Sequence, residues 1–189
     1  MLQRINYSLR SQFTAEQSVK CQGIDMSIEI RKIEDKDISG FYDALCTVAS
    51  EGVYLLTTNP PPYERMENFV RNNIEKNNSQ YVAVLNDKIV GWADIIPLER
   101  NTMNHVGHLG MGVIADFRGK GIGSQLLEKA IAHAWNQKLT RLELEVFSDN
   151  QIAIELYEKY KFEVEGVKKN ARLFENRYQN ITIMAQYGT

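Results

Sequence analysis

The chain has 189 residues, of which 43% are hydrophobic and 24% charged, a composition typical of one globular domain and not of a disordered or disulfide-rich chain. Its 22 basic and 24 acidic residues leave a formal net charge of −2, which argues against the broad basic surface of a nucleic-acid-binding protein. Cys21 and Cys46 lack a metal-ligand spacing, and no apolar run approaches the ~18 residues of a membrane span. These features predict a cytoplasmic protein without a metal and with neither nucleic acid nor membrane as partner.

The first 25 residues differ from the rest of the chain. They are rich in Gln, Ser and Arg and follow neither a helical nor a strand period. They also lack the apolar core of ~7–15 residues that a secretory signal needs. We expect residues 1–25 to be a non-catalytic N-terminal extension, with an added helix or an interaction arm as the alternative, and the domain to span residues 26–189.

Hydrophobic periodicity predicts alternating strands and helices from Met26 onward. A half-exposed strand over 27–33 precedes a helix that Asp35 or Asp37 caps and that Gly52 closes after about Thr47. Three prolines then hold the chain extended. The later patterns predict a helix over 63–76, strands over 81–85 and 89–96 joined by a tight turn, a strand over 105–114, a helix over 122–137, a strand over 141–147, a helix over 150–160 and strands over 162–167 and 181–186. This order predicts an α/β (α+β) fold in which helices cover a mixed sheet.

The predicted strand over 105–114 is unusual because it contains Gly107, Gly110 and Gly112. Glycine weakens a strand and is expected there only where the backbone must approach something closely. These glycines therefore mark the strand as a candidate binding element.

A second glycine-rich segment, Arg118-Gly119-Lys120-Gly121-Ile122-Gly123, lies between that strand and the next helix. Such a turn presents successive backbone N–H groups at the positive end of a helix, which suits phosphate binding. Arg118 and Lys120 add positive charge at the same place. The spacing fits neither a P-loop nor a dinucleotide-binding fingerprint. A flexible loop without a binding role is the alternative.

Near the C-terminal end, Asn150, Ala153 and Tyr157 fall on one face of a predicted helix, so a ligand along it would meet a polar cap, a small residue and a phenol. Together the two segments resemble the GCN5-related N-acetyltransferase (GNAT) superfamily, of bacterial type, from roughly Met26 to the C-terminus. The matching patterns are Arg/Gln-x-x-Gly-x-Gly/Ala at Arg118, Gly121 and Gly123, and Asn-x-x-Ala-x-x-Leu-Tyr-x-x-x-x-Phe at Asn150, Ala153, Leu156, Tyr157 and Phe162.

The resemblance implies a mixed, mostly antiparallel sheet of about seven strands with about four helices, splayed where the co-substrate acetyl-CoA binds. A local bulge in the splayed strand would leave N–H groups free for the pantetheine arm and the acetyl carbonyl. The pyrophosphate would lie on the N–H groups of residues 118–123. Asn150 would contact the cofactor arm, cap its helix, or do both. The implied cofactor-binding residues are Met111, Val113, Ile114, Arg118, Gly119, Lys120, Gly121, Ile122, Gly123, Ser124, Asn150, Ala153 and Tyr157.

The resemblance further implies that a primary amine attacks the thioester directly. Such an amine has a pKa of ~10.4 and must lose a proton first. Tyr157 matches the position that protonates the departing thiolate, with a core aromatic as the alternative. Glu145 matches the base position of bacterial ribosomal-protein N-terminal acetyltransferases, unless it is an ordinary solvated carboxylate beside Glu143. His108 is the second candidate base, because its unperturbed pKa of ~6.5 suits proton acceptance, and a water chain is the third.

In the family the acceptor binds between the segment joining the first two helices and the last hairpin, here residues 52–63 and 168–177. The basic run Lys168-Lys169-Asn170-Ala171-Arg172 favours a carboxylate-bearing acceptor, although a solvated loop is the alternative. We expect a small amine, an amino acid or a peptide N-terminus as acceptor. A non-catalytic CoA-binding sensor or partner-binding module is the alternative function. A homodimer is compatible with the resemblance.

Overall fold

A seven-stranded sheet organises the computed structural model, which describes residues 28–188. The extension expected over residues 1–25 lies outside the described residues. The elements are β1 (Glu29–Lys32), α1 (Ile38–Ser50), α2 (Tyr63–Glu75), β2 (Ser79–Leu85), β3 (Lys88–Pro97), β4 (Val106–Val113), α3 (Ile122–Asn136), β5 (Arg141–Phe147), α4 (Gln151–Lys159), β6 (Glu163–Phe174) and β7 (Arg177–Tyr187), with short 3-10 helices at Asp35–Asp37 and Ala115–Phe117.

The strands lie in the order β1-β2-β3-β4-β5-β7-β6. Every neighbouring pair is antiparallel except β4 and β5, which are parallel. The predicted mixed, mostly antiparallel sheet with four α-helices is therefore confirmed. Among residues 28–188, no helix combines the length and the apolar character needed to cross a membrane.

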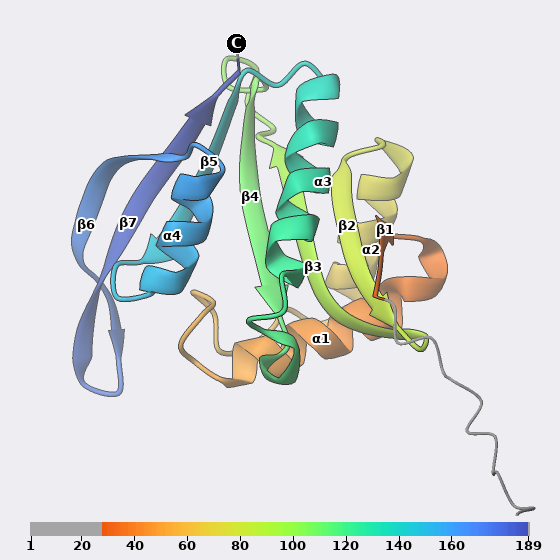
Figure 1. The fold of residues 1–189 in the computed structure, drawn as a ribbon, viewed down its shortest axis with the longest axis horizontal. Helices are drawn as coiled ribbons and strands as arrows, with labels where there is room; N and C mark the ends of the chain where they lie inside the picture. Colours follow the sequence, from red (N-terminus) through yellow and green to blue (C-terminus); the bar gives the residue numbers. More distant parts are fainter. Residues whose placement is uncertain (1–27, 189) are drawn as a thin grey trace, which may run out of the picture.

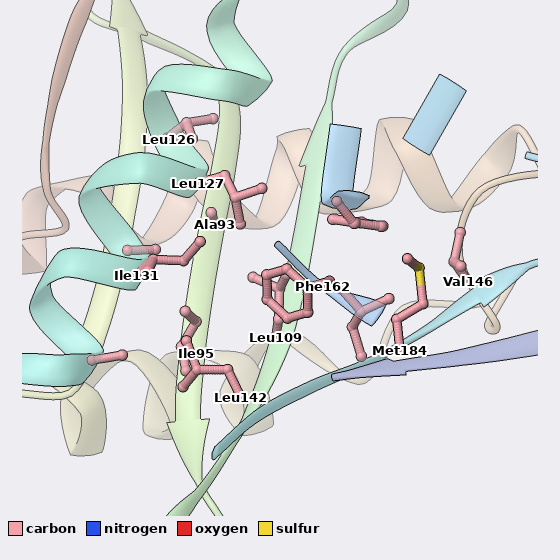
Figure 2. Packing of buried hydrophobic residues seen from close by; sticks show 14 of the residues in the cluster. Ala93, Ile95, Leu109, Leu126, Leu127, Ile131, Leu142, Val146, Phe162 and Met184 are labelled. Carbon is pink, nitrogen blue, oxygen red and sulfur yellow. The ribbon is translucent and has the colours of Figure 1, made fainter. Parts of the chain in front are cut away.

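Helices cover both faces of the sheet (Figure 1). On one face, α3 packs on β2, β3 and β4 and buries Leu126, Leu127 and Ile131 in a cluster that also takes in Phe162 and Met184 (Figure 2). On the other face, α1 and α2 form a second cluster, in which Phe41 meets Trp92 edge-on at 5.6 Å between ring centroids. Because full burial of one such side chain contributes about 1.5–3 kcal/mol, these two clusters hold the layers together.

The last hairpin is longer than predicted, since β6 and β7 extend over 163–174 and 177–187 instead of 162–167 and 181–186. Most of β6 is exposed on both faces, so its sequence lacks the alternation from which strands are recognised. Its two-residue turn places Glu175 and Asn176 at positive φ (48° and 59°). The β2–β3 turn does the same with Asn86 and Asp87, residue types that tolerate this conformation without glycine.

Candidate active site

An opening between β4 and β5 lies at the centre of the sheet. The two strands pair at three positions only, the last being His108 opposite Glu143. Beyond this point β4 stays paired with β3 and β5 stays paired with β7, so the two strands diverge (Figure 1). The expected splay is therefore present.

The backbone of β4 presents alternate residues to this opening. The N–H of Ile114 donates to the Val90 carbonyl at 3.0 Å. Because hydrogen bonds alternate sides along an antiparallel strand, the even-numbered residues of β4 bond to β3. The backbone groups of Met111 and Val113 consequently face the opening, as expected. The N–H of Ile114 is already used by the sheet, and the expected contact of this residue with the pantetheine arm stays a prediction.

The expected bulge in β4 is wrong, and its glycines have a packing role instead. The register with β3 runs unbroken from Gly107 to Val113. A Cβ on Gly107 would lie 2.6 Å from Ile95, and one on Gly112 would clash with the Trp92 ring. These two glycines make room for side chains of the protein, and the opening results from the divergence of β5.

The glycine-rich turn leads into α3 as predicted. Gly119 and Gly121 have positive φ (71° and 79°), and an added Cβ would meet nothing within 4 Å at either position. Among residues 28–188, no hydrogen bond begins at the backbone N–H groups of residues 119–124. Six consecutive free donors at the start of a 15-residue helix form a cradle that fits a phosphate group.

Arg118 differs from its expected role, because its side chain and its N–H are both occupied. The guanidinium donates to the two Glu51 carboxylate oxygens at 2.8 and 2.6 Å and to the Val113 carbonyl at 2.8 Å, and it stacks on the Tyr54 ring at 4.2 Å. Its hydrogen bonds to Glu51 raise the pKa of Arg118. Its N–H donates to the Ala115 carbonyl at 3.1 Å. Arg118 therefore fastens the turn to the end of α1 and is not a free phosphate ligand.

The C-terminal half of α4 lies beside the start of α3, because a Cβ on Gly123 would lie 3.5 Å from the Leu156 side chain. The side chain of Asn150 accepts a hydrogen bond from the Ala153 N–H at 3.2 Å and so caps α4, which leaves its amide NH₂ group for another acceptor. The Tyr160 hydroxyl donates to the Ser124 carbonyl at 2.9 Å. Ile122 is 1% exposed and belongs to the core, so only its backbone is available to a ligand.

Tyr157 is buried in the core cluster beneath the opening, with 8% of its surface exposed. Its ring centroid lies 6.0 Å from that of Phe162. Burial raises the pKa of Tyr157 well above the ordinary value for a phenol, and no hydrogen bond of its hydroxyl occurs within residues 28–188. The phenol therefore stays protonated across the neutral range and is available as a donor.

The two predicted bases have different surroundings. The Glu145 carboxylate accepts a hydrogen bond from the Lys168 ammonium at 2.5 Å. This ion pair occupies the carboxylate that would have to accept the proton. His108 is exposed at the point where β4 and β5 part.

Sequence reasoning missed Asp94, a half-buried carboxylate on β3 directly opposite Gly110 of β4. Burial raises the pKa of Asp94 to about 7. A carboxylate inside the apolar run Ala93-Asp94-Ile95-Ile96 was the available signal, since an ionisable group is seldom placed in a core strand without a role.

A second missed feature is the clip formed by Arg172 of β6. Its Nη1 donates to the Gly52 carbonyl at 2.8 Å and to the Gln179 side chain at 3.0 Å. Its guanidinium also stacks on Phe147 and Phe174, at 4.9 and 4.3 Å from the ring centroids. Phe174 and Gln179 line a hollow of about 540 Å³ between the last hairpin and the segment after α1.

The strand opening, the free N–H groups of residues 119–124 and the buried phenol fit an enzyme that transfers an acyl group from a phosphate-bearing donor. The sequence profile of the acetyltransferase (GNAT) family matches residues 49–162 of this chain. The chain belongs to this family and is an acetyl-CoA-dependent N-acetyltransferase.

Individual relatives agree with this assignment. The L-amino acid N-acetyltransferase AaaT of Escherichia coli is 34% identical over 108 residues, which cover 57% of this chain and 67% of that protein. A GNAT-family acetyltransferase from Streptococcus pneumoniae superposes with a TM-score of 0.79 at 30% identity, over 85% of this chain and 99% of that one. The fold of yncA from Salmonella typhimurium, solved with its cofactor acetyl-CoA, also superposes with a TM-score of 0.79, at 16% identity, over 85% of this chain and 93% of that one.

Proposed function

We propose that this N-acetyltransferase moves the acetyl group of acetyl-CoA to the primary amine of a small acceptor that carries a carboxylate, with an amino acid as the favoured case. A peptide N-terminus or a small amine without a carboxylate is the competing acceptor. The observation that carries the proposal is the guanidinium of Arg172, a half-buried cation beside the hollow at the last hairpin. The amino acid acceptor named for the E. coli relative supports the same class.

The donor would be held mainly by backbone groups. The free N–H groups of residues 119–124 would bind its pyrophosphate, and the outward-facing groups of Met111 and Val113 would pair with its pantetheine arm. Ala153 and the amide of Asn150 would border that arm along α4. When bound, acetyl-CoA supplies an activated acetyl thioester. The N–H of Met111 is then suited to polarise its carbonyl, because a fixed donor in a partly dry opening favours the developing negative charge.

Tyr157 is the residue that would protonate the sulfur of acetyl-CoA. Because its raised pKa keeps the phenol protonated, the hydroxyl donates a hydrogen bond to the sulfur as the C–S bond breaks. The supporting observations are its burial beneath the opening and the absence of another acceptor for the hydroxyl within residues 28–188.

Arg172 is suited to bind a carboxylate. In the part of the chain that the structure describes, no ion pair includes this residue. Nη1 makes both of its hydrogen bonds, so Nη2 and Nε remain as a planar pair of donors that matches a carboxylate. The two phenylalanine rings fix the plane of the guanidinium. A purely structural clip is the competing explanation, because the same contacts tie the hairpin to Gly52.

An acceptor screen tests the proposal. Purified protein would be incubated with acetyl-CoA and matched amino acids, amino acid amides, simple amines and peptides, with free CoA and N-acetylated product both measured. We expect stoichiometric CoA and N-acetyl amino acid. Release of CoA with amines and amides alone would contradict the carboxylate requirement, and no release with any acceptor beside measurable CoA binding would support the sensor alternative.

A further inference from the structure

We propose that Asp94 is the base that accepts the proton of the acceptor ammonium, a role that rests on the proposed function. Its position in the sheet supports this role. Asp94 lies directly across from Gly110 on β4, two residues beyond the last pairing of β4 with β5 at His108. Asp94 is therefore one strand away from the opening where the thioester would be bound, and Gly110 has no side chain to separate them.

The direction of the Asp94 side chain also supports this role. Oδ1 of Asp94 lies 3.2 Å from the position that a Cβ on Gly110 would occupy, so the carboxylate lies over the backbone of β4. Asp94 shares its face of the sheet with Trp92, which packs on Phe41 of α1. The helices α3 and α4, which border the donor, lie on the opposite face. The carboxylate thus approaches the opening from the side left to the acceptor.

The Asp94 carboxylate is not committed to another contact, because no hydrogen bond or ion pair among residues 28–188 includes it. Its neighbour on β2, Gln80, is fully buried and shares the same face. Asn78 donates to Asn73 and Asn73 donates to Gln80, each at 3.0 Å, and this chain of amides ends at a Gln80 Nε2 without a partner. Two cross-strand neighbours on this face, the Asp94 carboxylate and the Gln80 amide, thus both have uncommitted polar groups.

The ionisable groups around Asp94 leave it as the best-placed free base. His108 is exposed on β4, Glu145 on β5 is paired with Lys168, and Glu143 on β5 is paired with Arg141 at 3.1 Å. On α1, Tyr42 donates its hydroxyl to the Pro61 carbonyl at 3.1 Å, and Cys46 is a free, half-buried thiol. Burial brings the pKa of Asp94 to about 7, so roughly half of the carboxyl groups are ionised at pH 7 and the ionised form is basic enough to take a proton.

The proton balance is simple. One proton moves from the acceptor ammonium to the Asp94 carboxylate, and the freed nitrogen lone pair forms the C–N bond. As the C–S bond breaks, the sulfur receives a proton from Tyr157, which regains one from the attacking nitrogen. The net change is one amide formed, one thioester broken and one proton released, which Asp94 passes to solvent.

The test combines variants with acceptors of different basicity. For an amino acid acceptor we expect wild-type kcat/KM to fall below a pH near 7, Asp94→Asn to lower kcat/KM by about 10²–10⁴-fold, and this acidic limb to disappear in the variant. An acceptor whose amine pKa lies below 7 arrives already neutral, so the loss should be small for that acceptor. Asp87→Asn, in the exposed β2–β3 turn, is the matched control and should behave as wild type.

A second readout needs no turnover. In protein labelled with ¹³C at aspartate carboxyl groups, we expect one carboxyl resonance to titrate near pH 7 and to be missing in Asp94→Asn. The proposal is overturned if Asp94→Asn keeps both the wild-type rate and the acidic limb of the kcat/KM profile. It is also overturned if Glu145→Gln or His108→Ala alone removes that acidic limb, or if no aspartate carboxyl resonance titrates near pH 7. A wild-type protein inactive with every acceptor would instead overturn the proposed function.

Discussion

Tyr157 is the residue to which we assign protonation of the leaving thiolate. We expect Tyr157→Phe to lower kcat by about 10²-fold or more, because the sulfur loses its only assigned proton donor. The ring packing beside Phe162 is kept, so the Kd for acetyl-CoA, measured by calorimetry, should change little. Wild-type kcat in this variant would contradict the role, and an equal loss in acetyl-CoA affinity would assign Tyr157 to binding.

Asp94 should reduce stability in its ionised form. Its pKa is about 7 in the folded chain and about 3.9 in an unfolded chain. The folded state therefore holds the extra proton between these values, and stability falls as pH rises from about 4 to 7. Asp94→Asn cannot ionise and therefore removes this pH-dependent loss of stability. In a partly solvated site, the free energy of unfolding should rise by about 2 kcal/mol in the variant at pH 8, which corresponds to a melting temperature roughly 4–8 °C above that of wild type. At pH 4 the two melting temperatures should match. Equal melting temperatures at both pH values would contradict the buried carboxylate.

Individual site residues were predicted only where a motif identifies them. Tyr157, Asn150 and the glycines of the turn lie in two short patterns, and the structure brings both patterns to one edge of the opening. Asp94 and Arg172 depend on partners in other strands. Gly52 lies 120 residues from Arg172 in sequence, so no local pattern records that contact.

At the scale of elements, the glycine-rich turn owes its function to backbone conformation. Gly121 has a φ of 79° and open space around an added Cβ, so alanine would introduce strain of about 1–2 kcal/mol without a clash. We expect Gly121→Ala to weaken acetyl-CoA binding by about 10-fold, because the N–H groups would turn away from the phosphates. Gly166→Ala, on β6 with equally open space and no positive φ, is the matched control. Equal affinities in the two variants would contradict the cradle.

Most helices and strands were predictable because only one of their faces is buried, which leaves a regular hydrophobic pattern in the sequence. β5 and α3 have ends within one residue of those expected, since β5 alternates buried and half-buried positions and α3 carries a continuous apolar face. The long last hairpin was underestimated because β6 is mainly exposed. The bulge in β4 was wrongly expected because its glycines were taken as a sign of irregular backbone. The Trp92 and Ile95 side chains explain these glycines instead, since they leave no room for a Cβ at Gly112 and Gly107.

At the scale of the whole molecule, the proposed donor and acceptor residues lie on opposite faces of the sheet. The glycine-rich turn leads into α3 on one face, whereas Asp94 shares the other face with Trp92, which packs on α1. Arg172 joins the last hairpin to the end of α1, and Arg118 joins the same helix end to the glycine-rich turn through Glu51. Both proposed substrate sites are therefore tied to one segment, which follows α1.

The most direct test of the proposed function compares an amino acid with its carboxyl amide as acceptor, in wild type and in Arg172→Gln. We predict that wild type prefers the acid, and that the variant loses about 10–100-fold in kcat/KM for the acid, as expected when a hydrogen bond to a charged group is removed, while kcat/KM for the amide stays unchanged. Equal losses for both acceptors would make Arg172 a structural clip. Equal use of acid and amide by wild type would contradict a carboxylate-bearing acceptor.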